Sequence, residues 1–139
     1  MAVLVPYDGS KPARNALTEA VTEYGDQTIV LLRVIEAADG SLEAGLNLLQ
    51  EQFEHDPEEL VEDIADEVIE TLEATEGNYE VETRIGKPAR EIVTYADEHD
   101  DIEQILIGSH GREGVSRVLL GSVAENVVRR SPVSVTVVR

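Results

Sequence analysis

The strongest constraint on the fold is a regular alternation of two apolar patterns along the chain. Short β-rich apolar runs alternate with segments whose apolar residues recur every three or four positions. Strands that alternate with helices form mainly parallel sheets, so we predict an open, doubly wound, five-stranded α/β fold with helices on both faces. The five strands are predicted at residues 2–7, 28–35, 79–85, 103–107 and 133–138, and the four helices begin after Ser10, near Pro57, at Pro88 and at Ser122.

One segment fits this alternation poorly. Residues 36–55 contain glycines and several acids within a weakly helical stretch. We interpret the segment as a long connection with one helical part. It is either a lid over a bound ligand or a variable, solvated loop.

Length and composition exclude several classes of protein. A chain of 139 residues can bury a core of its own, so residues 1–139 are predicted to form a single domain. Cysteine is absent, which excludes disulfides and thiolate metal sites, and the three histidines lack ligand-like spacing. No apolar run approaches the ~20 residues of a membrane helix, and the first residues do not resemble a signal peptide. We therefore expect a cytoplasmic protein with no membrane partner and no metal site.

The charge balance is strongly acidic and uneven. Eleven Lys and Arg residues stand against 29 Asp and Glu residues, a formal net charge of −18. Such a surface repels phosphate backbones, so we expect no nucleic-acid partner. It suits work in concentrated salt, where charges are screened, and a halophilic source is our hypothesis. Residues 108–139 nevertheless carry five arginines and two glutamates, net +3, whereas residues 1–107 carry −21.

Four glycines are gathered where the predicted fourth strand leads into the last helix. The stretch GSHGREGVSRVLLGS contains the spacing Gly-x2-Gly-x9-Gly-Ser. It lies at the carboxyl edge of the predicted sheet, where open α/β sheets bind their ligands. Ser122 and Glu125 match a capping box, which would order the start of the last helix. Free N–H groups at a helix start attract anions, so the stretch predicts a phosphate site.

Charged side chains in the same stretch support an anion. Arg112, and less directly Arg117, can add charge-assisted hydrogen bonds to a phosphate, and His110 lies in the same turn. The alternative is that the glycines serve only turns and helix caps. Their joint spacing favours the phosphate site over that alternative.

The glycine motif also resembles that of a known family. Gly108-x2-Gly111-x9-Gly121-Ser122, with VLVPYDGS at the first strand and GKPA before the third helix, resembles the ATP-binding branch of the universal stress protein family. The resemblance covers nearly the whole domain. It implies strand order 3-2-1-4-5, a homodimer formed through residues 133–138, and bound ATP.

The resemblance also implies which residues bind the nucleotide. Asp8 and the backbone of Val34 would contact adenosine, and the glycine motif would line the ribose and phosphates. Asp8 follows the first strand, where a carboxylate can accept from ribose hydroxyls; it is otherwise a turn residue that bonds the following backbone. The full expected set is Pro6, Tyr7, Asp8, Val34, Gly108, His110, Gly111, Arg112, Gly121, Ser122 and Val123.

The function predicted from these residues is binding of ATP by a stress-response or regulatory protein. Phosphoryl transfer needs neutralised charge, usually by Mg²⁺, and an oriented nucleophile. The sequence identifies neither a group that neutralises the charge nor a nucleophile, so we name no catalytic residue. Whether Mg²⁺ binds together with ATP stays open. One alternative is a slow ATP-hydrolysing or adenylating enzyme, although Asp8-Gly9-Ser10 differs from the Ser-Gly-Gly-x-Asp-Ser loop typical of adenylating pyrophosphatases. The other alternative is a structural dimer with an empty site.

Overall fold

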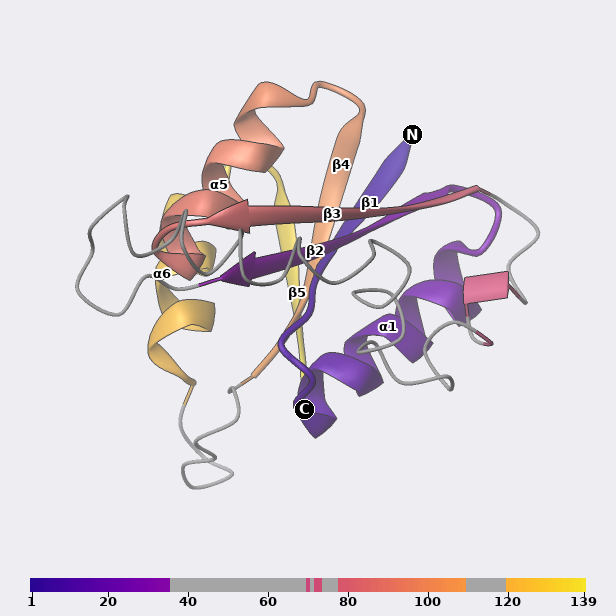
Figure 1. Cartoon of the computed structure of the whole chain (residues 1–139), viewed down its shortest axis with the longest axis horizontal. Coiled ribbons are helices and arrows are strands. Elements are labelled where there is room, and N and C mark those ends of the chain that lie inside the picture. Colours follow the sequence, from indigo (N-terminus) through magenta and orange to yellow (C-terminus); the bar gives the residue numbers. More distant parts are fainter. Residues whose placement is uncertain (36–69, 71, 74–77, 110–119) are drawn as a thin grey trace, which may run out of the picture.

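The computed structural model describes residues 1–35, 70, 72, 73, 78–109 and 120–139. In these ranges the chain forms a parallel sheet of order β3-β2-β1-β4-β5 together with three longer helices, which confirms the predicted fold class and strand order (Figure 1). The start of the helix predicted near Pro57 and the 36–55 connection lie outside the described residues, but Glu70, Leu72 and Glu73 at the end of that helix are helical, and Leu72 is buried. The elements are β1 (Ala2–Pro6), α1 (Lys11–Tyr24), β2 (Thr28–Ile35), β3 (Tyr79–Ile85), α5 (Pro88–Glu98), β4 (Ile102–Gly108), α6 (Ser122–Arg130) and β5 (Ser134–Val138).

Alternate residues of each central strand supply two separate cores. In β1, Val3 and Val5 pack on the face covered by α1, whereas Ala2 and Leu4 pack on the face covered by α5 and α6. Figure 1 shows α1 on one side of the sheet and the other two helices on the opposite side. Successive side chains of a strand point to opposite faces, so a strand covered on both faces must be apolar at nearly every position.

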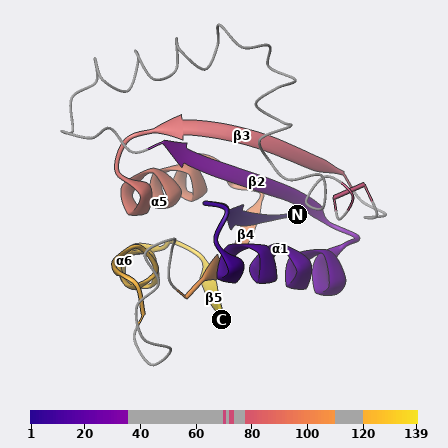
Figure 2. The same ribbon diagram turned by 60° about the horizontal axis from the view of Figure 1, so that its bottom comes forward.

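The edge strands are more exposed than the central ones. All of β1 is buried, whereas the first five residues of β3 are exposed. Figure 2 shows the strands in order from β3 at the top of the view to β5 at the bottom. The alternation in YEVETRI correctly placed this segment at an edge of the sheet. The expected half-buried pattern is wrong for its first five positions, whose side chains are exposed on both faces.

The start of α1 forms as its sequence predicts. Ser10 is the N-cap, its hydroxyl accepts from the N–H of Ala13 at 3.2 Å, and Pro12 lies in the first turn, where its missing N–H costs nothing. This cap fixes the direction in which α1 leaves the end of β1. Among the described residues, no helix is long and apolar enough to cross a membrane.

Candidate functional site

The candidate site is the carboxyl edge of the sheet between β1 and β4. The chain passes from β1 to β2 on one side and reaches β4 on the other, so the strand order reverses between these two neighbours. A crevice forms at such a reversal, and ligands of open α/β sheets bind there. The ends of β1 and β4, the starts of α1 and α6 and the C-terminus all lie in the lower part of Figure 1.

Two backbone hydrogen bonds hold the start of α6 against this edge. The N–H of Ser109 donates to the carbonyl of Val138 at 2.7 Å, and the N–H of Gly121 donates to the carbonyl of Ser109 at 2.7 Å. Ser109 itself is only 7% exposed. The ends of β4, β5 and α6 are therefore joined through one buried residue.

The start of α6 differs from the capping box that the sequence predicts. Gly121, rather than Ser122, is the N-cap, and a glycine supplies no side chain to cap the helix. The carboxylate of Glu125 instead binds Arg129 at 2.9 Å. The capping-box prediction is therefore wrong, because the long-range bond from Gly121 to Ser109 sets the helix start one residue earlier. As a result, the first N–H groups of α6 have no side-chain acceptor in the described part of the chain.

Gly108 has a packing role that the sequence did not reveal. A Cβ atom added at this position would lie 2.8 Å from the backbone nitrogen of Ala13 and 2.9 Å from two atoms of Pro12. Real Cβ atoms almost never approach other atoms so closely. The bare backbone of Gly108 thus allows α1 to pack against the end of β4. Contact between Gly108 and a nucleotide stays a prediction.

Asp8 lies at the end of β1 and performs the turn role that the sequence left open. Its Oδ1 atom accepts from the N–H of Ser10 at 2.9 Å, and the residue is exposed. This bond orients the carboxylate at the carboxyl edge. A further contact to ribose hydroxyls stays a prediction.

The remaining predicted site residues are placed as follows. Pro6 ends β1, and Tyr7 is 9% exposed in the α1-side core, with its N–H bonded to the carbonyl of Leu32 at 2.8 Å. Val34 is partly buried near the carboxyl end of β2, on the α5 side. The structure thus brings the ends of β1, β2 and β4 to one edge together with the start of α6. His110, Gly111 and Arg112 lie outside the described residues.

Sequence reasoning missed the part played by Ser109. Its contribution is made by backbone atoms, which bond β5 on one side and α6 on the other. Because any residue with an N–H and a carbonyl can make these bonds, its identity carries no signal in the sequence. The only clue is its position directly after a buried strand.

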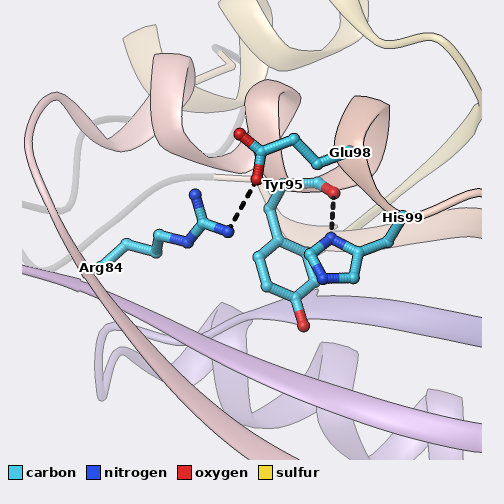
Figure 3. Close-up of polar contacts among 4 residues, drawn as sticks. All are labelled: Arg84, Tyr95, Glu98 and His99. Carbon is cyan, nitrogen blue, oxygen red and sulfur yellow. Dashed lines mark hydrogen bonds and ion pairs between the residues drawn. The ribbon is translucent and has the colours of Figure 1, made fainter.

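A second polar cluster lies away from this edge, between β3 and the end of α5 (Figure 3). Arg84 binds the carboxylate of Glu98 at 2.9 Å, and its guanidinium lies 5.0 Å from the centre of the Tyr95 ring. His99 stacks on that ring at 4.0 Å, and its Nδ1 lies 2.8 Å from the carbonyl of Tyr95. Because a carbonyl oxygen only accepts, Nδ1 carries the proton. The contacts of Arg84 fasten α5 to β3, whereas those of His99 lie within the end of α5.

The family of the chain follows from comparison with known proteins. A family model described as the universal stress protein family matches residues 1–139. The chain belongs to this family. A universal stress protein of Methanocaldococcus jannaschii is 31% identical over 152 residues, which cover 99% of this chain and 93% of that protein.

Solved structures of family members share the fold. Universal stress protein UspA from Lactobacillus plantarum is 27% identical, with a TM-score of 0.81 over 100% of this chain and 97% of that one. A universal stress protein family protein from Arabidopsis thaliana, which has AMP bound, is 17% identical, with a TM-score of 0.61 over 99% of this chain and 90% of that one.

Proposed function

We propose that this universal stress protein is a cytoplasmic stress-response protein that binds ATP at the carboxyl edge of its sheet. The observation that carries the proposal is the start of α6, which no side chain of the described residues caps and which is held against β4 by the bond between Gly121 and Ser109. Uncapped N–H groups at a fixed helix start attract phosphate oxygens through hydrogen bonds and through the helix dipole.

The structure refines which N–H groups would bind the phosphates. The N–H of Gly121 already donates to Ser109, so the next two groups, those of Ser122 and Val123, are the better candidates. Gly111, Arg112 and His110 of the glycine motif would complete the phosphate side. Asp8 and Val34 would contact the adenosine. Asp8 follows β1 and Val34 lies near the end of the neighbouring strand β2, so both are at the carboxyl edge.

The Arabidopsis family member supports the proposal at the level of the fold. That protein holds AMP, so this architecture can accommodate an adenine nucleotide. The case for the present chain depends on its own residues, above all the glycine motif and the start of α6. We include a homodimer through β5 in the proposal, because β5 is an unpaired edge of the described sheet and is rich in β-branched residues.

The proposal is tested by titrating ATP and adenosine calorimetrically against the parent and three variants. Gly121→Val should abolish ATP binding, because its side chain blocks the approach to the helix start. The backbone there, at φ −64° and ψ 158°, is open to valine, and circular dichroism checks folding. Arg112→Ala should weaken ATP binding by about 1–3 kcal/mol and adenosine binding by less. Glu113→Gln in the same motif is the matched control and should bind ATP like the parent.

Each result separates the proposal from its alternatives. If Gly121→Val binds ATP like the parent, the phosphates do not bind at the start of α6. If the parent binds neither ligand, the alternative of a structural dimer with an empty site is favoured, and its mass in light scattering tests that alternative. Conversion of bound ATP to ADP or AMP during prolonged incubation, followed by chromatography, would identify a slow enzyme.

A further inference from the structure

The charged residues of α1 run opposite to the order that its dipole favours. Its first turn contains Lys11 and Arg14 and no acid, whereas Glu19 and Glu23 lie in its second half and no base lies in its last turn. A helix dipole is positive at the N-terminus, so acids are favourable there and bases are favourable at the other end. In a chain with 29 acidic residues, this arrangement is the less stable of the two possible orders.

The start of α5 is similar. Lys87 is its N-cap residue and Arg90 follows in the first turn beside one acid, Glu91, whereas Asp97 and Glu98 end the helix without a base in the last turn. The helices run back across the sheet from the carboxyl ends of its strands, so their first turns lie at the carboxyl edge (Figure 1). Basic residues therefore collect at the edge that contains the candidate site.

Lys11 and Arg14 have no ion-pair partner among the described residues. Both side chains are exposed, and no carboxylate of the described ranges lies within ion-pair distance of either. By contrast, Arg84 and Arg129, at other places on the surface, each bind a glutamate at 2.9 Å. Cations that no described carboxylate neutralises keep their positive potential available to a ligand.

A contact from α1 to the end of the chain places this pair beside the site. Asn15, next to Arg14, donates from its side-chain amide to the carbonyl of Arg139 at 2.9 Å. Figures 1 and 2 both show the C-terminus beside the first turns of α1. Arg139 directly follows β5, whose last residue, Val138, is bonded to Ser109. Lys11 and Arg14 thus flank the edge on the side opposite to α6.

We propose that Lys11 and Arg14 steer polyphosphate ligands to the carboxyl edge and so raise the rate of association. This inference rests on the proposed function and adds a kinetic role for residues outside the glycine motif. A local positive field on a protein with net charge −18 offsets the repulsion that an anionic nucleotide would otherwise meet. Steering acts before contact, so it changes the association rate and leaves the dissociation rate nearly unchanged.

The test compares two double variants with the same change in net charge. Stopped-flow fluorescence measures binding of 2-aminopurine riboside triphosphate, a fluorescent isomer of ATP whose ribose hydroxyls are free, to the parent, to Lys11→Glu/Arg14→Glu and to the control Arg129→Glu/Arg130→Glu at the far end of α6. In about 20 mM KCl, the first variant should associate about fivefold to tenfold more slowly, and the difference should vanish near 1 M KCl. Dissociation should stay within about twofold of the parent, and the control should match the parent in both rates.

A second measurement does not depend on nucleotide binding. Lys11→Glu/Arg14→Glu restores the favourable order of charge in α1, so its thermal midpoint at low salt should lie above that of the control, which has the same net charge but places its new acids at the end of α6. A midpoint equal to or below that of the control would overturn the premise that these cations oppose the dipole.

The kinetic outcomes are equally decisive. Equal slowing in both variants would mean that only net charge matters, and faster dissociation of the first variant would mean that its residues hold the bound phosphates; either result overturns steering. The nucleoside 2-aminopurine riboside, which has no phosphate, should associate with all three proteins at the same rate. If the parent binds neither ligand, the proposed function fails and the inference fails with it.

Discussion

Gly108→Ala should destabilise the protein even when no nucleotide is present. The new Cβ would meet the backbone nitrogen of Ala13 at 2.8 Å and the carbonyl carbon and Cβ of Pro12 at 2.9 Å. None of these atoms is the end of a flexible side chain, so α1 itself must move. The helix resists such a movement because Ala16 and Leu17, one turn further on, are at most 1% exposed.

The expected loss is about 1–3 kcal/mol, the usual cost of overpacking a core. For a chain of this length, that loss lowers the thermal midpoint by roughly 3–10 °C. Alanine is otherwise no worse than glycine in a strand, so the sign of the effect depends on the clash alone.

The assay is thermal denaturation in concentrated KCl without nucleotide, and Gly121→Ala is the control. Gly121 has φ −64° and ψ 158°, which alanine adopts freely, so that variant should lose at most about 1 kcal/mol. If Gly108→Ala melts within about 1 °C of the parent, α1 does not require a glycine at this position.

Three further predictions concern pH, salt and assembly. Burial, aided by Glu82 and Glu80, raises the pKa of Tyr95 above 10.0, so the unfolded chain loses this proton at a lower pH than the folded protein. The stability should therefore fall as the pH rises above about 10, and it should fall less in Tyr95→Phe. Thermal melts between about pH 9 and 11 that gave the same slope for both proteins would contradict this prediction. The thermal midpoint should rise from low to molar KCl, because self-repulsion of the acidic surface is then screened, and a flat midpoint would refute the proposed salt adaptation. Light scattering at micromolar concentration should give a dimer mass that is lost on deletion of residues 133–139; a monomer mass for the parent would exclude pairing through β5.

The fold could be predicted because burial on two faces leaves a direct mark on the sequence. TIVLLRVI is apolar at nearly every position, and residues 29–32 of β2 are indeed buried on both faces. Strand ends were less certain. β1 ends at Pro6 although its pattern extends to Tyr7, whose N–H still bonds the neighbouring strand, and β5 begins at Ser134, one residue after the predicted start.

The sequence could predict only those parts of the site that lie close together along the chain. Counted along the sequence, Arg129 and Arg130 belong to the same positively charged region as the glycine motif. In the structure they lie in the last turn of α6, whereas the motif ends at its first turn. The same count assigned Lys11 and Arg14 to the acidic part of the chain, although the fold brings them to the carboxyl edge. Such proximity depends on how α1 packs on β4, which no local pattern encodes.

The bond between Ser109 and Gly121 has a consequence for the 110–119 connection. It joins backbone atoms on either side of the connection, so the two ends stay at one separation whatever side chains lie between them. Lengthening a loop with fixed ends costs little, about 0.6 kcal/mol for each doubling. We therefore expect that residues 110–119 can be exchanged for the corresponding residues of another family member while β4, β5 and α6 stay in place.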